Sequence, residues 1–99
     1  MRYLILLILL AAHAYAQSVN TVTLMWNLST ADGITWQSVY RSEECSGVYV
    51  KRAEVRSTEV EWTDYNVKTG QTLCYYITAN DHQQESAPSN VVQVQIPTN

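Results

Sequence analysis

The sequence predicts an all-β fold, an antiparallel sandwich of short strands. Short stretches alternate between inward apolar and outward residues, as half-buried strands do, and polar or glycine-containing clusters separate them. Val, Thr, Tyr and Trp, which favour strands, are frequent in these stretches, and no helical period is sustained after residue 17. Six predicted strands at this spacing favour a two-sheet sandwich.

The first residues predict an export signal. Arg2 supplies a positive start, Leu4–Ala12 is apolar throughout, and Ala14-Tyr15-Ala16 is a small-x-small cleavage site. The apolar run is shorter than the roughly 20 residues of a spanning helix, although a retained anchor is the alternative. We therefore expect residues 1–16 to be a signal peptide, cleaved after Ala16. The remaining residues 17–99 form one domain, secreted, periplasmic or held at the cell surface.

Two strands are predicted in the first half of this domain. Val22, Leu24 and Trp26 alternate with outward residues, which predicts a strand that buries one face. A turn at Asp32-Gly33 follows, and a second strand then covers residues 34–41 before the polar segment 42–47 interrupts it.

Four further strands are predicted in the second half. Residues 48–55 form a weaker and more charged strand, and residues 59–63 form a very short one. After a turn at Lys68-Thr69-Gly70, residues 73–81 alternate cleanly, with Leu73, Tyr75, Ile77 and Ala79 on one face. Residues 81–88 are a polar loop, and residues 91–96 form the last strand.

A family resemblance rests on the order of several segments: VTLMW, VYRS, EWTD, GQTLCYYITAND, and ESAPSN followed by VVQVQIP. From about Val22 to Pro97 the chain resembles a fibronectin type III domain, in the form common in secreted and surface proteins of bacteria and in phage proteins. The resemblance implies an immunoglobulin-like sandwich, here with a short first strand around residues 17–20. Leu73 stands where the family usually has a tyrosine that ties down a loop, and Gln37 where it usually has an aromatic residue.

The two cysteines predict one disulfide. Cys45 and Cys74 are the only pair in a chain routed to an oxidising compartment, with two free buried thiols as the alternative. In the fold that the resemblance implies, the strand of Cys74 pairs with the strand 34–41. Cys45, just past the end of that strand, would then lie nearby on the outer face, and the disulfide would pin the loop 42–47.

Composition and spacing argue against several functions. Residues 17–99 hold five basic and nine acidic residues, a net charge of −4, so nucleic acid and anionic membrane surfaces are poor partners. His82 is the single histidine after the leader, and nothing in its spacing from Asp81 and Glu85 favours a metal site. We expect no catalytic residues, no cofactor and no metal.

Outward aromatic residues are the candidate binding surface. Trp36, Tyr40 and Tyr76 should point outward from paired strands, with Tyr49 near the edge and His82 in the adjoining loop. Scattered surface aromatics that only support strand pairing are the alternative.

The predicted function is a non-enzymatic binding, adhesion or assembly module acting through protein–protein contacts. A carbohydrate-binding accessory module is one alternative. A structural subunit of an envelope or virion surface, which self-associates by strand addition, is another. The expected partner is thus a protein, a cell-surface glycan or a second copy.

Overall fold

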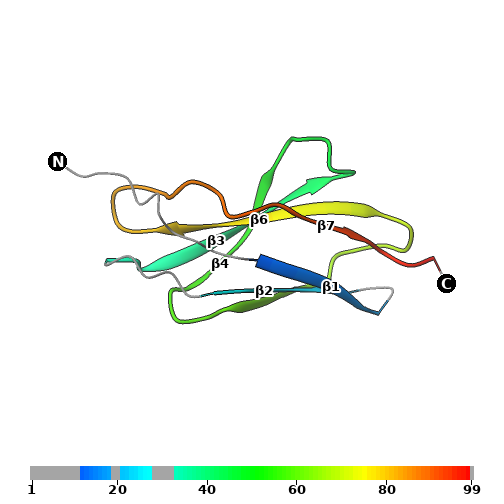
Figure 1. The fold of residues 1–99 in the computed structure, drawn as a ribbon, viewed down its shortest axis with the longest axis horizontal. Helices are drawn as coiled ribbons and strands as arrows, with labels where there is room; N and C mark the ends of the chain where they lie inside the picture. Colours follow the sequence, from blue (N-terminus) through cyan, green and yellow to red (C-terminus); the bar gives the residue numbers. More distant parts are fainter. Residues whose placement is uncertain (1–11, 19–20, 28–32, 99) are drawn as a thin grey trace.

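The computed structural model describes residues 12–18, 21–27 and 33–98, and within these it contains strands and no helix. The strands form two antiparallel sheets, one with the order β1-β2-β5 and one with the order β4-β3-β6-β7 (Figure 1). The predicted all-β sandwich is confirmed. The strand bounds are β1 Ala12–Ser18, β2 Thr21–Trp26, β3 Trp36–Glu43, β4 Val50–Arg56, β5 Glu61–Asp64, β6 Thr72–Asn80 and β7 Val92–Gln95.

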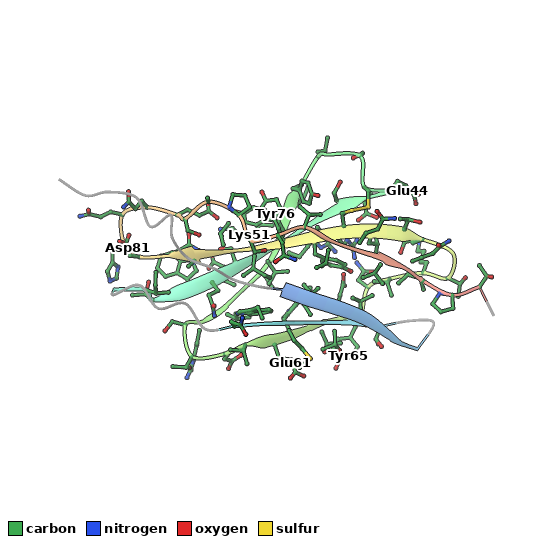
Figure 2. The ribbon with its side chains drawn as sticks, viewed as in Figure 1. Glu44, Lys51, Glu61, Tyr65, Tyr76 and Asp81 are labelled. Carbon is green, nitrogen blue, oxygen red and sulfur yellow. A yellow bond between two sulfur atoms is a disulfide. The ribbon has the colours of Figure 1, made fainter. Side chains whose placement is uncertain are left out.

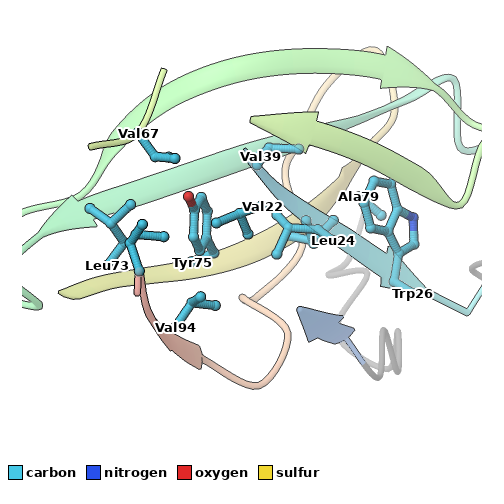
Figure 3. Close-up of a cluster of buried hydrophobic side chains, with 11 residues drawn as sticks. Val22, Leu24, Trp26, Val39, Val67, Leu73, Tyr75, Ala79 and Val94 are labelled. Carbon is cyan, nitrogen blue, oxygen red and sulfur yellow. The ribbon is translucent and has the colours of Figure 1, made fainter. Parts of the chain in front are cut away.

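The core lies between the two sheets and follows the alternation of the sequence. Val22, Leu24 and Trp26 of β2 are buried, as are the alternate apolar residues of β6 between Leu73 and Ala79 (Figure 3). Trp62 of β5 packs against this cluster from the edge. These two strands supply most of the buried cluster. Each large aliphatic or aromatic side chain that is fully buried stabilises the fold by about 1.5–3 kcal/mol.

The first strand lies upstream of its expected position around residues 17–20. β1 begins at Ala12 and pairs with β2 from Ala12↔Trp26 to Ser18↔Thr21. A strand that starts there can offer backbone partners along the whole length of β2, which a few residues just before β2 cannot. Residues 1–11 of the expected leader and residues 19–20 of the expected first strand lie outside the described residues.

Gln37 is fully buried where the family usually has an aromatic residue, and all of its polar atoms are used. Its Oε1 accepts a hydrogen bond from the indole N–H of Trp26 at 2.8 Å. Its Nε2 donates to the carbonyl of Arg56 at 3.0 Å and to that of Glu59 at 2.8 Å. One amide therefore joins β3, the core tryptophan of β2 and the turn that carries the chain from β4 to β5.

A second buried polar network holds the loop after β5. The Asp64 carboxylate accepts hydrogen bonds from Arg41 and from the Tyr75 hydroxyl, both at 2.7 Å. It also accepts one from the backbone N–H of Asn66, whose carbonyl in turn accepts from Arg41. Leu73 is buried and has no hydroxyl, so this network ties down the loop that the family's tyrosine usually holds.

Candidate binding surface on the four-stranded sheet

The disulfide closes one end of the outer face of the four-stranded sheet. Cys45 and Cys74 are bonded, as predicted, with their Cα atoms 5.0 Å apart. Cys45 lies in a tight turn in which the N–H of Ser46 donates to the carbonyl of Glu43. Glu44 and Cys45 have φ angles of 52° and 51°, which place two non-glycine residues in the left-handed region. The disulfide thus anchors a turn whose backbone is locally unfavourable.

Three tyrosines gather beside it and form what we call the tyrosine cluster: Tyr40 of β3, Tyr76 of β6 and Tyr49 of the loop before β4. Tyr40 and Tyr76 are directly opposite in the strand register, and their rings stack at 4.9 Å. The Tyr49 ring lies 4.6 Å from that of Tyr76. All three side chains are half-buried, so the cluster presents aromatic surface together with hydroxyl groups.

Glu85 fixes the orientation of Tyr40 within the cluster. Its Oε2 accepts hydrogen bonds from the hydroxyls of Tyr40 and Thr78, both at 2.6 Å. Burial, followed by the Glu85 carboxylate, raises the pKa of Tyr40 well above its usual range, and the same two causes raise the pKa of Tyr76. Both hydroxyls therefore remain protonated at neutral pH, and that of Tyr40 acts as a donor.

The loop that carries Glu85 is held to β6 by serine side chains. Ser86 accepts a hydrogen bond from the N–H of Ala79 through its hydroxyl and donates its own N–H to the Ala79 carbonyl. Ser89 makes the equivalent pair of bonds with Ile77. These bonds explain the ESAPSN motif, because the two serines continue the ladder where the chain is not a regular strand. Sequence reasoning placed Glu85 in this loop but missed its role.

Trp36 and His82 form a separate pair further along the sheet. Their ring centroids are 6.4 Å apart in an edge arrangement. Trp36 lies four residues from Tyr40 on β3, about 13 Å along an extended strand, so it does not reach the tyrosine cluster. The indole nitrogen of Trp36 is buried and has no hydrogen-bond partner in the described part of the chain. The five predicted surface residues therefore fall into a cluster of three and a pair.

A hollow of about 320 Å³ opens beside the disulfide loop, and no pattern in the sequence predicted it. Two exposed valines, Val48 and Val50, stand on its wall next to charged side chains. Its lining is Arg41, Glu43, Ser46, Val48, Val50 and Arg52. Arg41 is already engaged by two carboxylates: burial alone would lower the pKa of Arg41, but Asp64 and Glu43 together outweigh this and raise it.

The described residues offer no group of three or more His, Cys, Asp or Glu side chains placed to hold a metal ion. No helix in the described part of the chain is long and apolar enough to cross a membrane. Chemically, the outer face offers stacked aromatic rings, hydroxyl donors and a carboxylate. These groups are suited to non-covalent recognition.

No protein-family model matches the sequence, and no curated protein matches it either. Among solved structures, an Fn3-like protein from Clostridium thermocellum is 32% identical, with 91% of this chain and 90% of that chain covered and a TM-score of 0.70. A β-1,2-glucanase from Parabacteroides distasonis matches at 26% identity over 93% of this chain, with a TM-score of 0.74. The FN1–FN3 domains of chicken CNTN1 match at 11% identity over 88% of this chain, with a TM-score of 0.80, which shows the fold alone.

This chain spans 13% of the glucanase and 29% of the chicken CNTN1 structure, so it corresponds to one unit of each longer chain. Fn3 domains commonly serve as binding or structural modules, and some are parts of enzymes. The Clostridium thermocellum protein is similar in sequence and fold over nearly its full length. The chain belongs to the fibronectin type III family.

Proposed function

We propose that this protein is an exported, non-enzymatic binding module that recognises another protein through the tyrosine cluster. One observation carries the proposal: Tyr40, Tyr49 and Tyr76 meet on one outer sheet face, from three different segments, within 4.9 Å of a neighbouring ring. Tyrosine is enriched where proteins bind one another because it gives a large contact area at little conformational cost.

The surroundings of the cluster support a role in recognition. Glu85 holds the hydroxyl of Tyr40, and the rings of Tyr40 and Tyr49 both pack on that of Tyr76, so little side-chain entropy is lost on binding. Lys51, which pairs with Glu54, adds a half-exposed charge beside Tyr40 in the register. An aromatic centre with a charged rim is the usual anatomy of a protein interface.

Export is the second part of the proposal. The positive, apolar and small-x-small pattern of residues 1–16 supports a leader. The disulfide adds support, because such bonds persist in oxidising compartments and are rare in the cytosol. The same compartment is where a partner protein would be met.

Native mass spectrometry of tagged protein, recovered gently from its producing cells, tests the proposal. The tests use Tyr49→Ser, which changes the cluster at a loop position. Tyr65→Ser is the matched control, because Tyr65 is 77% exposed and lies by the three-stranded sheet, away from Tyr76 (Figure 2). We expect the wild type and Tyr65→Ser to keep the same bound protein and Tyr49→Ser to lose it.

Two results would count against the proposal. Retention of the partner by Tyr49→Ser would place the contact elsewhere. A bound mass that glycosidases remove would instead assign the surface to a carbohydrate, which the stacking of sugars on tyrosine rings would explain. The same spectra report whether the chain starts at Gln17 and whether its two cysteines are oxidised.

A further inference from the structure

β1 lies across the bond that the leader is expected to lose. Six register pairs join β1 to β2, and five of them use residues Ala12–Ala16. Cleavage after Ala16 removes those five pairs and leaves Ser18↔Thr21. The strand that covers β2 in the full chain is therefore absent from the mature one.

The residues left in front of β2 are too few to replace it. Only residues 17–20 precede Thr21 after cleavage, and even the tightest hairpin uses two residues as its turn. At most two residues remain to pair. Residues 23–26 of β2 would then form the free edge of a two-stranded sheet.

The backbone groups on that edge follow from the register. The N–H of Trp26 donates to the carbonyl of Val60 on the β5 side. Because successive residues of a strand direct their N–H and C=O groups to opposite sides, Thr23 and Met25 direct theirs toward β1. In the full chain they lie opposite Tyr15 and His13, respectively. Cleavage uncovers the two donors and two acceptors of Thr23 and Met25.

β2 has none of the features that protect a natural edge. Its sequence, TVTLMW, contains no charge, proline or glycine, and its pairing with β5 has no bulge. β4, an edge of the other sheet, contrasts with it: VKRAEVR holds four charged residues, and its register shifts opposite Val39 and Tyr40. Charges and bulges block edge-to-edge pairing, so β2 has the composition of an inner strand.

We propose that the mature domain pairs through this edge with β2 of a second copy. The strands run antiparallel about a two-fold axis, with Leu24 opposite Leu24 of the partner subunit. Thr23 of each copy then faces Met25 of the other, and each pair exchanges both backbone hydrogen bonds. An antiparallel edge is self-complementary about a two-fold axis, and uncharged strands meet without repulsion. The proposal depends on leader cleavage and is independent of the tyrosine cluster, which lies on the other sheet.

The test begins with the whole chain, exported by its own leader, followed by sedimentation equilibrium over a wide concentration range. Met25→Pro removes an N–H that faces the new edge and spares the β5 ladder, and proline is tolerated at such positions. The Met25 side chain is 41% exposed, so the change does not empty the core. Met25→Thr is the matched control, because it shortens the side chain and keeps the N–H. A version that retains residues 12–16, through another leader joined at Ala12, keeps β1.

We expect the wild-type chain that starts at Gln17 to change from monomer to dimer mass as its concentration rises. We expect the same of Met25→Thr. Met25→Pro and the chain that starts at Ala12 remain monomers. A monomeric Gln17 chain, a dimer that survives Met25→Pro, or an exported chain that still holds residues 12–16 overturns the proposal.

A competition assay decides the case if Met25→Pro does not fold. A synthetic peptide of residues 12–18 is added to the mature wild type. Conversion of the dimer to a monomer supports pairing through β2, and an unchanged dimer rejects it. Tyr49→Ser should not change the dimer, because the tyrosine cluster lies on the other sheet. Failure of the proposed binding function and failure of this pairing are therefore distinguishable.

Discussion

Replacing Gln37 tests whether a buried amide or simple apolar packing stabilises the centre of this sandwich. Gln37→Met keeps the length of the side chain and removes its three hydrogen bonds. The indole N–H of Trp26 and the carbonyl of Glu59 lose a partner, whereas the carbonyl of Arg56 keeps the bond from the N–H of Glu59. Glu59 is an exposed residue whose carbonyl water can reach, so the indole N–H of Trp26 is the group left buried without a partner, at a cost of about 1–3 kcal/mol. We expect a total loss of about 1–3 kcal/mol, a large share of the stability of a small domain.

Urea unfolding of the oxidised protein, followed by tryptophan fluorescence, measures this loss. Gln93→Met is the matched control, because Gln93 is an exposed residue of β7 and the same chemical change should move its stability by less than about 0.5 kcal/mol. Repeating Gln37→Met in a Trp26→Phe background tests whether the lost hydrogen bond from the Trp26 indole causes this loss of stability. With the indole donor already absent, the substitution should cost about 1–2 kcal/mol less.

An unfolding free energy for Gln37→Met within about 0.5 kcal/mol of the wild type would refute this reasoning, since the unpaired groups would then carry no penalty. So would an equal cost in the Trp26→Phe background. Gln37→Tyr gives an independent comparison, because it introduces the kind of residue that the family usually has. We expect it to destabilise this chain, since a tyrosine cannot both accept from the indole and donate to two carbonyls.

Three further predictions concern the disulfide turn and the buried tyrosine. Glu44→Asn should stabilise the domain by about 0.5–1 kcal/mol in urea unfolding, because asparagine tolerates the left-handed φ of Glu44, whereas the same change at Glu43 should not stabilise. Replacing Cys45 and Cys74 with serine should cost about 3–4 kcal/mol, from the entropy of a loop with a sequence separation of 29, and dithiothreitol should not change the stability of that variant. Burial and then Asp64 raise the pKa of Tyr75, so the folded state keeps this proton when the unfolded state loses it near pH about 10. The free energy of unfolding should therefore keep this contribution in full below about pH 10 and fall above it by up to about 1.4 kcal/mol per pH unit. Tyr75→Phe should reduce that slope.

The sequence predicted the parts of the fold that follow from alternation and turn chemistry. The period-two pattern identified the inward residues of β2 and β6, and each of Val22, Leu24, Tyr75 and Ile77 is fully buried. The disulfide followed from two cysteines and an export signal. Strand ends were less certain, because β3 continues to Glu43 through residues that the sequence predicted to be a loop. Polar residues at a strand end carry no local signal that distinguishes a ladder from a turn.

The polar contacts of the interior and the site could not be predicted in the same way. Gln37 and Arg41 are polar residues on the inward phase of a strand, and only their distant partners, Trp26 and Asp64, explain why burial is tolerated. The outward phase likewise identified Tyr40 and Tyr76 as exposed candidates. Tyr49 joins them because of the course of the loop before β4. Trp36 does not, because it lies too far along β3 from Tyr40. Neither is a property of the alternation.

The position of β1 shows why an export signal and a strand can occupy the same residues. The small residues of AHAYAQS suit a cleavage site, and an extended segment is also what an edge strand requires. Cleavage and strand pairing therefore exclude each other, and which one prevails decides whether β2 is covered from within the chain.

The two proposals use different sheets, so one molecule can satisfy both. Pairing through β2 lies in the sheet β1-β2-β5, and the tyrosine cluster lies on the outer face of β4-β3-β6-β7. A two-fold dimer formed at the first would therefore carry two unobstructed clusters. On a surface dense in partner molecules, the second cluster binds at a high local concentration, so the avidity exceeds the affinity of either cluster alone. Met25→Pro should then weaken retention on a dense partner surface while leaving the affinity for a single soluble partner unchanged. Tyr49→Ser should weaken both, which separates assembly from recognition in one pair of measurements.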